Sequence, residues 1–403
     1  MPELPEVENF RRLLLPLISW EHPLILERCS LEKAPPRKIV TDEEIIEIQN
    51  SELVVTDVLR KGKLICMVLN GKKRTKGKKQ RENCAAKYLF LHMGMTGRIS
   101  SPQCIPKLKE LSDTDIYPPP YTYLRLVAGS SQACFSDPRK FGSIYLKDSL
   151  LGDFDILAPD AWTSTRQIKT EMISQSRQGI GDDSAIINIL AKLTEQSMGI
   201  KGVLLDQKRA ISGVGNWVAD EVLYQTKMHP DQNYLTKEEA KVLLQRLHII
   251  LDQAVQCLYK DQEFPLDWLF HYRWNKRGSR KTTVKDMHGR SIVFVTSGGR
   301  TSAVIPSIQK KKSRKIVLST TPRKGQNKTK ESAKKMKRAT SKSPATPSEV
   351  VSEKSAKKVK LSEKDKAKNT NHSGKELKRQ KDAFIAVVEV KRDTRRSPRL
   401  AKI

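Results

Sequence analysis

The spacing of apolar residues changes near residue 184, and this change constrains the fold more than any other feature of the sequence. Between residues 52 and 146, short runs rich in β-branched and aromatic residues alternate with turn signals, which is typical of a β-sandwich or barrel. These runs are ELVVTDVL (52–59), KLICMVL (63–69), KYLFLHM (87–93), YTYLRLV (121–127) and SIYL (143–146). From residue 184, where SAIINILAKL begins, the apolar residues recur at helical spacing.

Helix signals lie on both sides of the predicted sandwich. After Pro5, which suits the first turn of a helix, apolar residues follow at helical spacing: Val7, Phe10, Leu14, Leu17 and Ile18. Further along, Thr236 and Glu239 form a capping box ahead of a long amphipathic helix. Around SIVFV (291–295) the β character returns, with Gly298 and Gly299 as a turn, which predicts a short hairpin.

The sequence therefore predicts an α+β multidomain protein. Its parts are an N-terminal β-sandwich or barrel with a leading helix over residues 1–150, a linker over 151–183, a helical domain over 184–270, a β-hairpin over 271–307 and a tail over 308–403.

The tail carries most of the net charge. Of the formal charge of +30, residues 308–403 supply 31 Lys and Arg against 9 Asp and Glu. With almost no aromatic residues, this segment cannot bury enough apolar surface to order itself, so we predict disorder. KKKSRK (310–315), KKMKR (334–338) and KKVK (357–360) indicate nuclear import or DNA tethering rather than solvated charge alone, and a nucleic acid is the expected partner.

The cysteines argue against a metal site. All six are scattered without a CxxC pair, which gives neither a thiolate zinc site nor a disulfide framework and fits a reducing compartment. We therefore expect no metal and no cofactor. No apolar run approaches the roughly 18 residues of a membrane span, and the acidic start does not fit a signal peptide.

Three glycine-containing turns carry candidate DNA contacts. In ISGVGNWVADE (211–221), Gly213 and Gly215 precede a helix start at Asn216. The two glycines and the helix start would either form a phosphate clamp or serve only as a turn. DPRKFG (137–142) and HMGMTG (92–97) offer Phe141 and Met95 as wedges for a base stack, although both side chains also suit core packing.

Five motifs in the same order resemble those of the formamidopyrimidine-DNA glycosylase family, of the MutM type: MPELPEVE, RKGK (60–63), HMGMTG, DPRKFG and ISGVGNWVADE. The resemblance covers residues 1–307. It implies that the N-terminal domain is a β-sandwich, that 184–270 contains a helix–two-turn–helix element and that the hairpin over 271–307 is a finger. Bacterial members end in a four-cysteine zinc finger, whereas this chain has no cysteine after Cys257. It therefore resembles a eukaryotic, plant-like member with a zincless finger.

The resemblance implies a bifunctional DNA glycosylase and AP lyase of base excision repair that acts on oxidised purines by β,δ-elimination. Pro2, freed by removal of Met1, would be the nucleophile and form a Schiff base. Glu3 would be the general acid, which must hold a proton near neutral pH, and Glu6 is the nearest second carboxylate. Lys63, rather than Lys61, would contact phosphate and assist the reaction.

The resemblance also assigns contacts to damaged double-stranded DNA. Met95, Arg139 and Phe141 would fill the space left by an extruded base, with Tyr121 and Lys140 beside them. Asn216 would contact phosphate, as would Lys201. In the finger, Arg300 is expected to grip phosphate and assist the second elimination, with Arg290 as its competitor.

A second departure concerns substrate choice. Bacterial relatives carry a glycine-rich stretch, which covers an extruded 8-oxoguanine, where this chain has CLYKDQEFPLDWLFHYRW (257–274). We therefore expect weak action on 8-oxoguanine and better action on formamidopyrimidines and further-oxidised guanines.

Two alternatives remain open. One is an endonuclease VIII-like enzyme for oxidised pyrimidines, which the finger favours and Leu4 disfavours. The other is a non-catalytic chromatin-binding protein, which the intact Pro2, Glu3 and Lys63 disfavour. We expect a monomer that does not bind membranes and contacts repair proteins through its basic tail.

Overall fold

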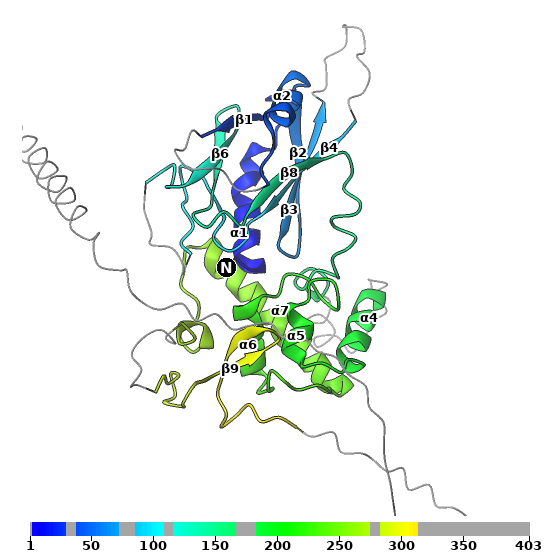
Figure 1. Ribbon diagram of the computed structural model, residues 1–403, viewed down its shortest axis with the longest axis vertical. Helices are drawn as coiled ribbons and strands as arrows, with labels where there is room; N and C mark the ends of the chain where they lie inside the picture. The colour runs from blue at the N-terminus through cyan, green and yellow to red at the C-terminus, as the bar shows by residue number, and fades with distance from the viewer. Residues whose placement is uncertain are drawn as a thin grey trace, which may run out of the picture. The chain divides into compact units, whose positions relative to one another are not determined.

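The computed structural model describes residues 2–29, 38–71, 85–108, 116–166, 183–274 and 283–312 (Figure 1). All of them lie within one compact unit, Met1–Ser319. The predicted disorder and the basic clusters of the tail fall outside the described residues, except for the first residues of the 310–315 cluster.

The helices and strands, in chain order, are α1 (Leu4–Leu14), η1 (Leu15–Leu17), β1 (Ile25–Arg28), α2 (Asp42–Asn50), β2 (Leu53–Lys61), β3 (Leu64–Gly71), β4 (Lys87–His92), β5 (Arg98–Ser100), β6 (Thr122–Ala128), β7 (Ser131–Ser136), β8 (Ser143–Lys147), α4 (Asp183–Thr194), α5 (Ile200–Leu205), α6 (Asn216–Gln225), α7 (Lys237–Tyr259), η2 (Leu269–His271), β9 (Val293–Ser297) and β10 (Arg300–Val304).

The predicted N-terminal β-sandwich is confirmed. One antiparallel sheet has the order β1-β6-β7-β5 and the other the order β2-β3-β4-β8. Alternate side chains of the two sheets point into a shared core with no access to solvent, in which Val55, Ile65, Leu91 and Phe135 are fully buried. The five strand runs predicted from the sequence correspond to β2, β3, β4, β6 and β8.

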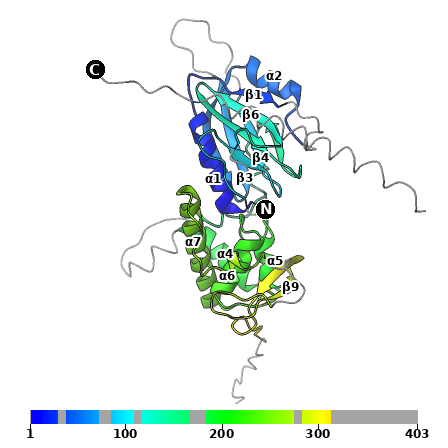
Figure 2. The ribbon, with the colours of Figure 1, turned by 90° about the vertical axis from the view of Figure 1, so that its left-hand side faces the viewer.

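Helix α1 links the sandwich to the helical domain. Its residues Val7, Phe10 and Leu14 pack in the sandwich core, whereas Leu4 packs in the core formed by α4 to α7. Figure 2 shows the amino terminus, beside α1, close to both groups of elements. The first residues of the chain are therefore held where the two cores meet.

The helical domain follows the predicted period. The capping box ahead of α7 is formed: Thr236 Oγ1 accepts from the Glu239 amide at 3.1 Å, and the Glu239 carboxylate accepts from the Thr236 amide at 3.0 Å. The buried face of α7 then packs against α6, whose Trp217 is only 2% exposed. This packing gives α6 a fixed position next to α1.

The segment predicted as a linker is packed as far as residue 166, first against the sandwich and, from Ala161 onward, against the helical domain. Asp160 is buried and its Oδ2 accepts from the Gly62 amide at 2.7 Å and from Arg60 Nη1 at 2.5 Å. Arg60 Nε also donates to Glu8 at 2.9 Å. Since neither ion pair is solvated, this part of the segment is a packed structural element. Residues 167–182 lie outside the described residues.

The predicted finger is a two-stranded antiparallel hairpin, β9 and β10. Its turn uses Gly298 and Gly299, whose φ angles of 56° and 72° favour glycine. The packed chain continues beyond the predicted end at 307, because the buried Gln309 accepts from the Ile305 amide at 2.8 Å and donates to the Met228 carbonyl at 2.9 Å.

Within the described ranges, no helix is both long and apolar enough to cross a bilayer. Nor do these ranges contain three or more His, Cys, Asp or Glu side chains grouped so that they could hold a metal ion.

Glu221 on α6 should make the stability of the fold depend on pH. Its fully buried carboxylate accepts from the Phe270 amide at 2.9 Å and from Gln225 Nε2 at 2.8 Å. Burial raises the pKa of Glu221 from 4.5 to about 7, so the folded protein keeps a proton that the unfolded chain loses. This stabilisation is complete below pH 4.5 and is lost as the pH rises through 7.

We expect the wild-type free energy of unfolding to fall by on the order of 1–3 kcal/mol across this window, and Glu221→Gln to remove that part of the slope. Urea unfolding at a series of pH values would measure it. An unchanged slope in the variant would contradict the assignment.

Candidate active site

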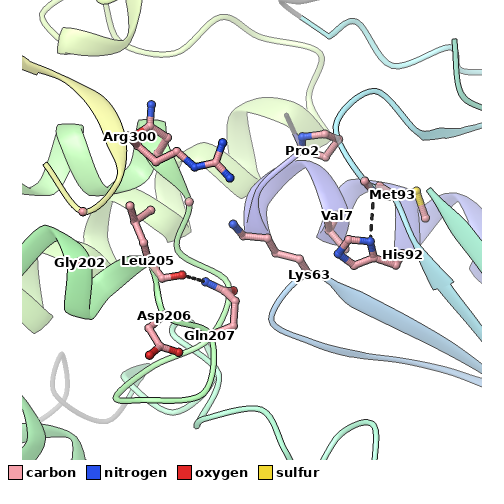
Figure 3. Close-up of a pocket in the computed structure, with 14 residues that line it drawn as sticks. Pro2, Val7, Lys63, His92, Met93, Gly202, Leu205, Asp206, Gln207 and Arg300 are labelled. Carbon is pink, nitrogen blue, oxygen red and sulfur yellow. Dashed lines mark hydrogen bonds between the residues drawn. The ribbon is translucent and has the colours of Figure 1, made fainter. Parts of the chain in front are cut away.

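A cavity of about 440 Å³ lies between the start of α1, the β-sandwich, the helical domain and the finger. Figure 3 shows the side chains of Lys63 and Arg300 extending toward the same space, with Pro2 at its edge. The residues that line it are Pro2, Val7, Lys63, His92, Met93, Gly94, Gly202, Leu205, Asp206, Gln207, Gly215, Asn216, Gly298 and Arg300. The cavity thus brings together three residues predicted to be catalytic from positions far apart in the sequence.

Glu3 fixes the amino terminus to helix α6. Its Oε1 accepts from the Trp217 amide at 2.8 Å and its Oε2 from the Val218 amide at 3.1 Å. The Leu4 amide also donates to the Gly213 carbonyl at 3.1 Å. A carboxylate suits this place because a helix start presents free N–H groups and a partial positive charge. Pro2 is thereby positioned at the cavity wall.

This arrangement corrects the prediction that Gly213 and Gly215 form a phosphate clamp. A Cβ on Gly215 would lie 2.2 Å from Glu3 Cδ, and a Cβ on Gly213 would lie 2.4 Å from a methyl carbon of Leu4. The two glycines therefore let the amino-terminal segment approach α6. The anion at this helix start is the Glu3 carboxylate, so the amides of Trp217 and Val218 are not free for a phosphate.

Glu6 lies next to Glu3 on α1. Its Oε2 accepts from the Glu3 amide at 2.9 Å and completes the capping box of the helix. Burial, followed by the nearby charge of Glu3, raises the pKa of Glu6 to about 7. Glu6 can therefore hold a proton near neutral pH beside Glu3, and the role of Glu3 as general acid stays a prediction.

Lys63 lies on the turn between β2 and β3, after Gly62, whose φ of 59° is left-handed. Burial lowers the pKa of Lys63. The nearby charges of Glu3 and Glu6 oppose this effect, whereas the charge of Arg300 adds to it. Lys61, the alternative, donates to the Phe154 carbonyl at 2.8 Å and is not among the residues lining the cavity.

The two finger arginines have different environments. Arg300 is exposed at the start of β10 and lines the cavity. Arg290 is paired with Asp286 and donates to the Tyr224 hydroxyl at 2.8 Å, away from the cavity lining. Of the two, only Arg300 lies where it can act with Pro2.

Lys201 does not occupy the place predicted for a phosphate contact. Its side chain is fully buried, and Nζ donates to Asp220 Oδ1 at 2.6 Å and to the Ser302 hydroxyl. Because this ammonium group is enclosed and already paired, it cannot reach DNA in this conformation. Asn216, by contrast, lines the cavity and donates to the Thr301 carbonyl at 3.1 Å.

The two turns predicted to hold wedge residues are joined by Asp137. Its carboxylate accepts from Thr96 Oγ1 at 2.6 Å, from the Arg139 amide at 3.2 Å and from the Gly142 amide at 2.7 Å. A Cβ on Gly94 would lie 2.3 Å from the Phe141 backbone, so this glycine permits the close approach of the turns.

Side chains suited to DNA contact project from this pair of turns. Phe141 is 57% exposed, and the Arg139 guanidinium lies over its ring at 5.3 Å from the centroid. Met95 is half-buried on the neighbouring turn. Tyr121 and Lys140 both have left-handed φ angles, 62° and 61°, at the edges of the same region. An exposed aromatic ring beside a cation suits contact with bases.

Among the lining residues that the sequence prediction did not name, two make side-chain hydrogen bonds that shape the site. His92 lines the cavity at the end of β4, and its Nδ1 accepts from the Gly94 amide at 3.3 Å, which leaves Nε2 as a donor. The HMGMTG motif contained this residue. Gln207 holds the loop before α6 by donating to the Val214 carbonyl and accepting from the Gly213 amide, at 2.9 and 2.8 Å. No sequence signal marked it.

A second cavity of about 460 Å³ is lined by Glu6, by residues 104–108 of the sandwich and by the segment that follows α7. Its aromatic wall comprises Trp217, Phe264, Phe270 and Trp274. The first three rings contact one another, with centroids about 5 Å apart. Of these rings, Phe270 and Trp274 are half-buried, whereas Trp217 and Phe264 are enclosed in the core.

Comparison with known proteins agrees with this geometry. Residues 1–144 match the formamidopyrimidine-DNA glycosylase N-terminal domain, and residues 176–262 match the H2TH domain of the same enzymes. The formamidopyrimidine-DNA glycosylase of Arabidopsis thaliana is 30% identical over 320 residues, which cover 77% of this chain and 71% of that protein. The Thermus thermophilus enzyme is 28% identical over 262 residues, covering 64% and 76%.

Solved structures have the same fold. The Lactococcus lactis enzyme, bound non-covalently to DNA containing an AP site, superposes with a TM-score of 0.51 at 22% identity, covering 77% of this chain and 100% of that one. The Thermus thermophilus MutM protein gives 0.51 at 23% identity, with the same coverage. The chain therefore belongs to the formamidopyrimidine-DNA glycosylase family of DNA-repair enzymes.

Proposed function

We propose that the protein is a bifunctional DNA glycosylase and AP lyase that removes oxidised purines from double-stranded DNA through a Schiff base on Pro2. The observation that carries the proposal is the shared cavity, in which Pro2, Lys63 and Arg300 meet beside the anchored Glu3. An amine nucleophile, a proton donor and two cations for phosphate are the groups that this reaction needs.

In the first step, the secondary amine of Pro2 attacks C1′ of the damaged nucleotide. The N–C1′ bond forms, the C1′–base bond breaks with its electron pair leaving on the base, and the departing base takes up the proton that the amine loses. Opening of the sugar then breaks C1′–O4′, O4′ takes a proton, and C1′ becomes an iminium carbon. We assign delivery of that proton to Glu3, which is adjacent to the nucleophile and lies beside Glu6, whose pKa is about 7.

In the second step, the iminium withdraws electrons and acidifies the proton on C2′. Loss of this proton expels the 3′ phosphate by β-elimination, and loss of the C4′ proton then expels the 5′ phosphate by δ-elimination. Arg300 and Lys63 stabilise the departing phosphates because both cations extend into the cavity (Figure 3). The lowered pKa of Lys63 also suits it to transfer protons.

Base removal requires extrusion of the nucleotide from the duplex. We assign Met95, Arg139 and Phe141 to the space left behind, because the exposed Phe141 ring and the guanidinium over it project from one turn and Met95 lies on the turn joined to it. We assign further contacts with the DNA near this space to Tyr121, Lys140, Asn216 and His92. The chain acts as a nuclear monomer, and its basic tail adds affinity for DNA and for repair proteins.

Ease of extrusion supports the proposed choice of substrate. Non-planar hydantoins and ring-opened formamidopyrimidines have weakened stacking in the duplex, which makes them easier to extrude than the planar 8-oxoguanine.

We expect single-turnover excision of formamidopyrimidine and hydantoin lesions to be at least about tenfold faster than excision of 8-oxoguanine, in line with the modest discrimination of pockets that lack a dedicated polar contact. Otherwise identical duplexes, each lesion opposite cytosine, would provide the comparison. Equal or faster excision of 8-oxoguanine would contradict the proposed preference.

The test of the reaction itself is borohydride trapping on a duplex that contains such a lesion. Reduction of the iminium would leave the protein covalently bonded to DNA, as a species of raised mass. Product release without any trapped species would exclude the Schiff-base mechanism.

A further inference from the structure

The carboxylate of Asp220 joins three separate parts of the chain. Its Oδ1 accepts from Lys201 Nζ of α5 at 2.6 Å. Its Oδ2 accepts from Arg273 Nη2 at 2.8 Å, and from the Ala303 amide of the finger strand β10 at 3.2 Å. Asp220 is 2% exposed and Lys201 is not exposed at all, so this cluster is closed to solvent.

The residues held by this cluster follow Arg300 directly. The Thr301 carbonyl accepts from Asn216 Nδ2 at 3.1 Å and from Lys201 Nζ at 3.3 Å. Lys201 Nζ also donates to the Ser302 hydroxyl. The Ala303 amide is bound to Asp220 as described above. Three consecutive residues of β10, 301 to 303, are therefore bound to the Asp220–Lys201 pair or to the start of α6.

The opposite side of the finger turn is fastened independently. The Ser297 hydroxyl donates to Asp231 at 2.6 Å. A Cβ on Gly298 would lie 2.9 Å from the Cα of Gly202, so the turn lies directly on α5. Arg300 therefore begins a strand whose backbone is fixed on both sides, while its own side chain extends into the cavity (Figure 3).

Electrostatics make Asp220 the central member of the cluster. Lys201 and Arg273 bring two positive charges into a space without water, and Asp220 is the carboxylate that pairs with both. Without it, two buried cations repel each other next to residues 301–303. Loss of the Lys201 proton, whose pKa burial already lowers, or movement of the finger strand would relieve this repulsion, and both weaken the bonds that hold β10. A shift of β10 would carry Arg300 with it.

We propose that Asp220 is the positioning residue of the finger: it gathers Lys201 and Arg273 around β10 so that Arg300 enters the cavity at the place where phosphate departs. The inference rests on the proposed function, in which Arg300 acts on that phosphate. In a finger with no cysteine after Cys257, this ion cluster supplies the rigidity that the hairpin needs.

The experiment compares Asp220→Asn with Glu221→Gln, each alone and combined with Arg300→Ala. Glu221 is the matched control because it is the next residue of α6, is equally buried and also binds the segment around η2, but it makes no contact with β10 in the described hydrogen bonds. The readouts are affinity for a duplex with a stable abasic analogue, and the ratio of δ- to β-elimination products on a natural abasic site.

We expect Asp220→Asn to weaken binding and lower the δ-to-β ratio, each by about tenfold, because small displacements of a catalytic group cost up to about a hundredfold. In the Arg300→Ala background the same substitution should have almost no further effect, since its consequence passes through Arg300. Effects that multiply in the double variant, or equal effects from Glu221→Gln, would overturn the proposal.

Two measurements keep the test decisive. If thermal melting shows that Asp220→Asn is unfolded, Arg273→Lys takes its place, because it keeps the charge but loses the two-bond contact with Asp220. Borohydride trapping by the wild type separates the two claims. Failure to trap refutes the proposed function, whereas normal trapping with wild-type binding and product ratios in the folded variants refutes only the role of Asp220.

Discussion

Replacing Pro2 with glycine should reduce lesion excision by on the order of 10³-fold or more, as loss of a covalent nucleophile does elsewhere. The variant keeps a terminal amine, but it loses the ring that fixes the nitrogen at the cavity wall and the secondary amine that forms an iminium readily. Quantified gel bands of lesion cleavage, and of the borohydride-trapped complex, would measure the loss.

A removable extension before Pro2 provides the stronger control. While the extension is attached, the Pro2 nitrogen is part of an amide and has no free electron pair for attack. We expect this form to bind damaged duplex without cleaving it, and proteolytic release of the extension to restore activity in the same sample. Cleavage or trapping by the extended form, with its intact mass verified, would show that Pro2 is not the nucleophile.

Glu3→Gln should separate the two proposed activities. Excision of a damaged base should fall by about 10²- to 10⁴-fold, because opening of the sugar needs a proton that an amide cannot supply. Cleavage of a preformed abasic site should fall much less, because its sugar already opens to an aldehyde in water. Glutamine can still accept one of the two amide hydrogen bonds that hold Glu3, so the segment should stay attached to α6.

The abasic duplex is the internal control for that variant. Losses of the same size on both substrates would mean that Glu3 serves only to place Pro2 and does not deliver a proton. Melting curves of the two proteins would show whether the lost hydrogen bond has loosened the fold.

Periodicity and capping signals predicted most of the secondary structure. The apolar runs became β2, β3, β4, β6 and β8, and the Thr236–Glu239 box begins α7 as expected. Helix α2 was missed although Thr41 and Glu44 form another capping box, which was a readable signal. Strand β7 was missed because SQACFS, over Ser131–Ser136, is short and polar, and only pairing with β6 makes it a strand.

The site was harder to predict where its members are brought together by tertiary contacts. Pro2, Lys63 and Arg300 were identified from motifs, and the structure places all three around one cavity. The partner of Glu3, by contrast, is a helix start more than 200 residues away, so Gly213 and Gly215 were assigned to phosphate. The charge of Lys201 suggested DNA, because nothing in the local sequence shows that Asp220 encloses it.

The bond from Glu3 to helix α6 also has a consequence for synthesis of the protein. The amino terminus leaves the ribosome first, yet the amides of Trp217 and Val218 that anchor it are made much later. Until more than half of the polypeptide has been translated, the amino terminus therefore lacks the helix start that holds it in place. A chain that ends before residue 217 would have no amides to fix Glu3, and Pro2 would have no defined position.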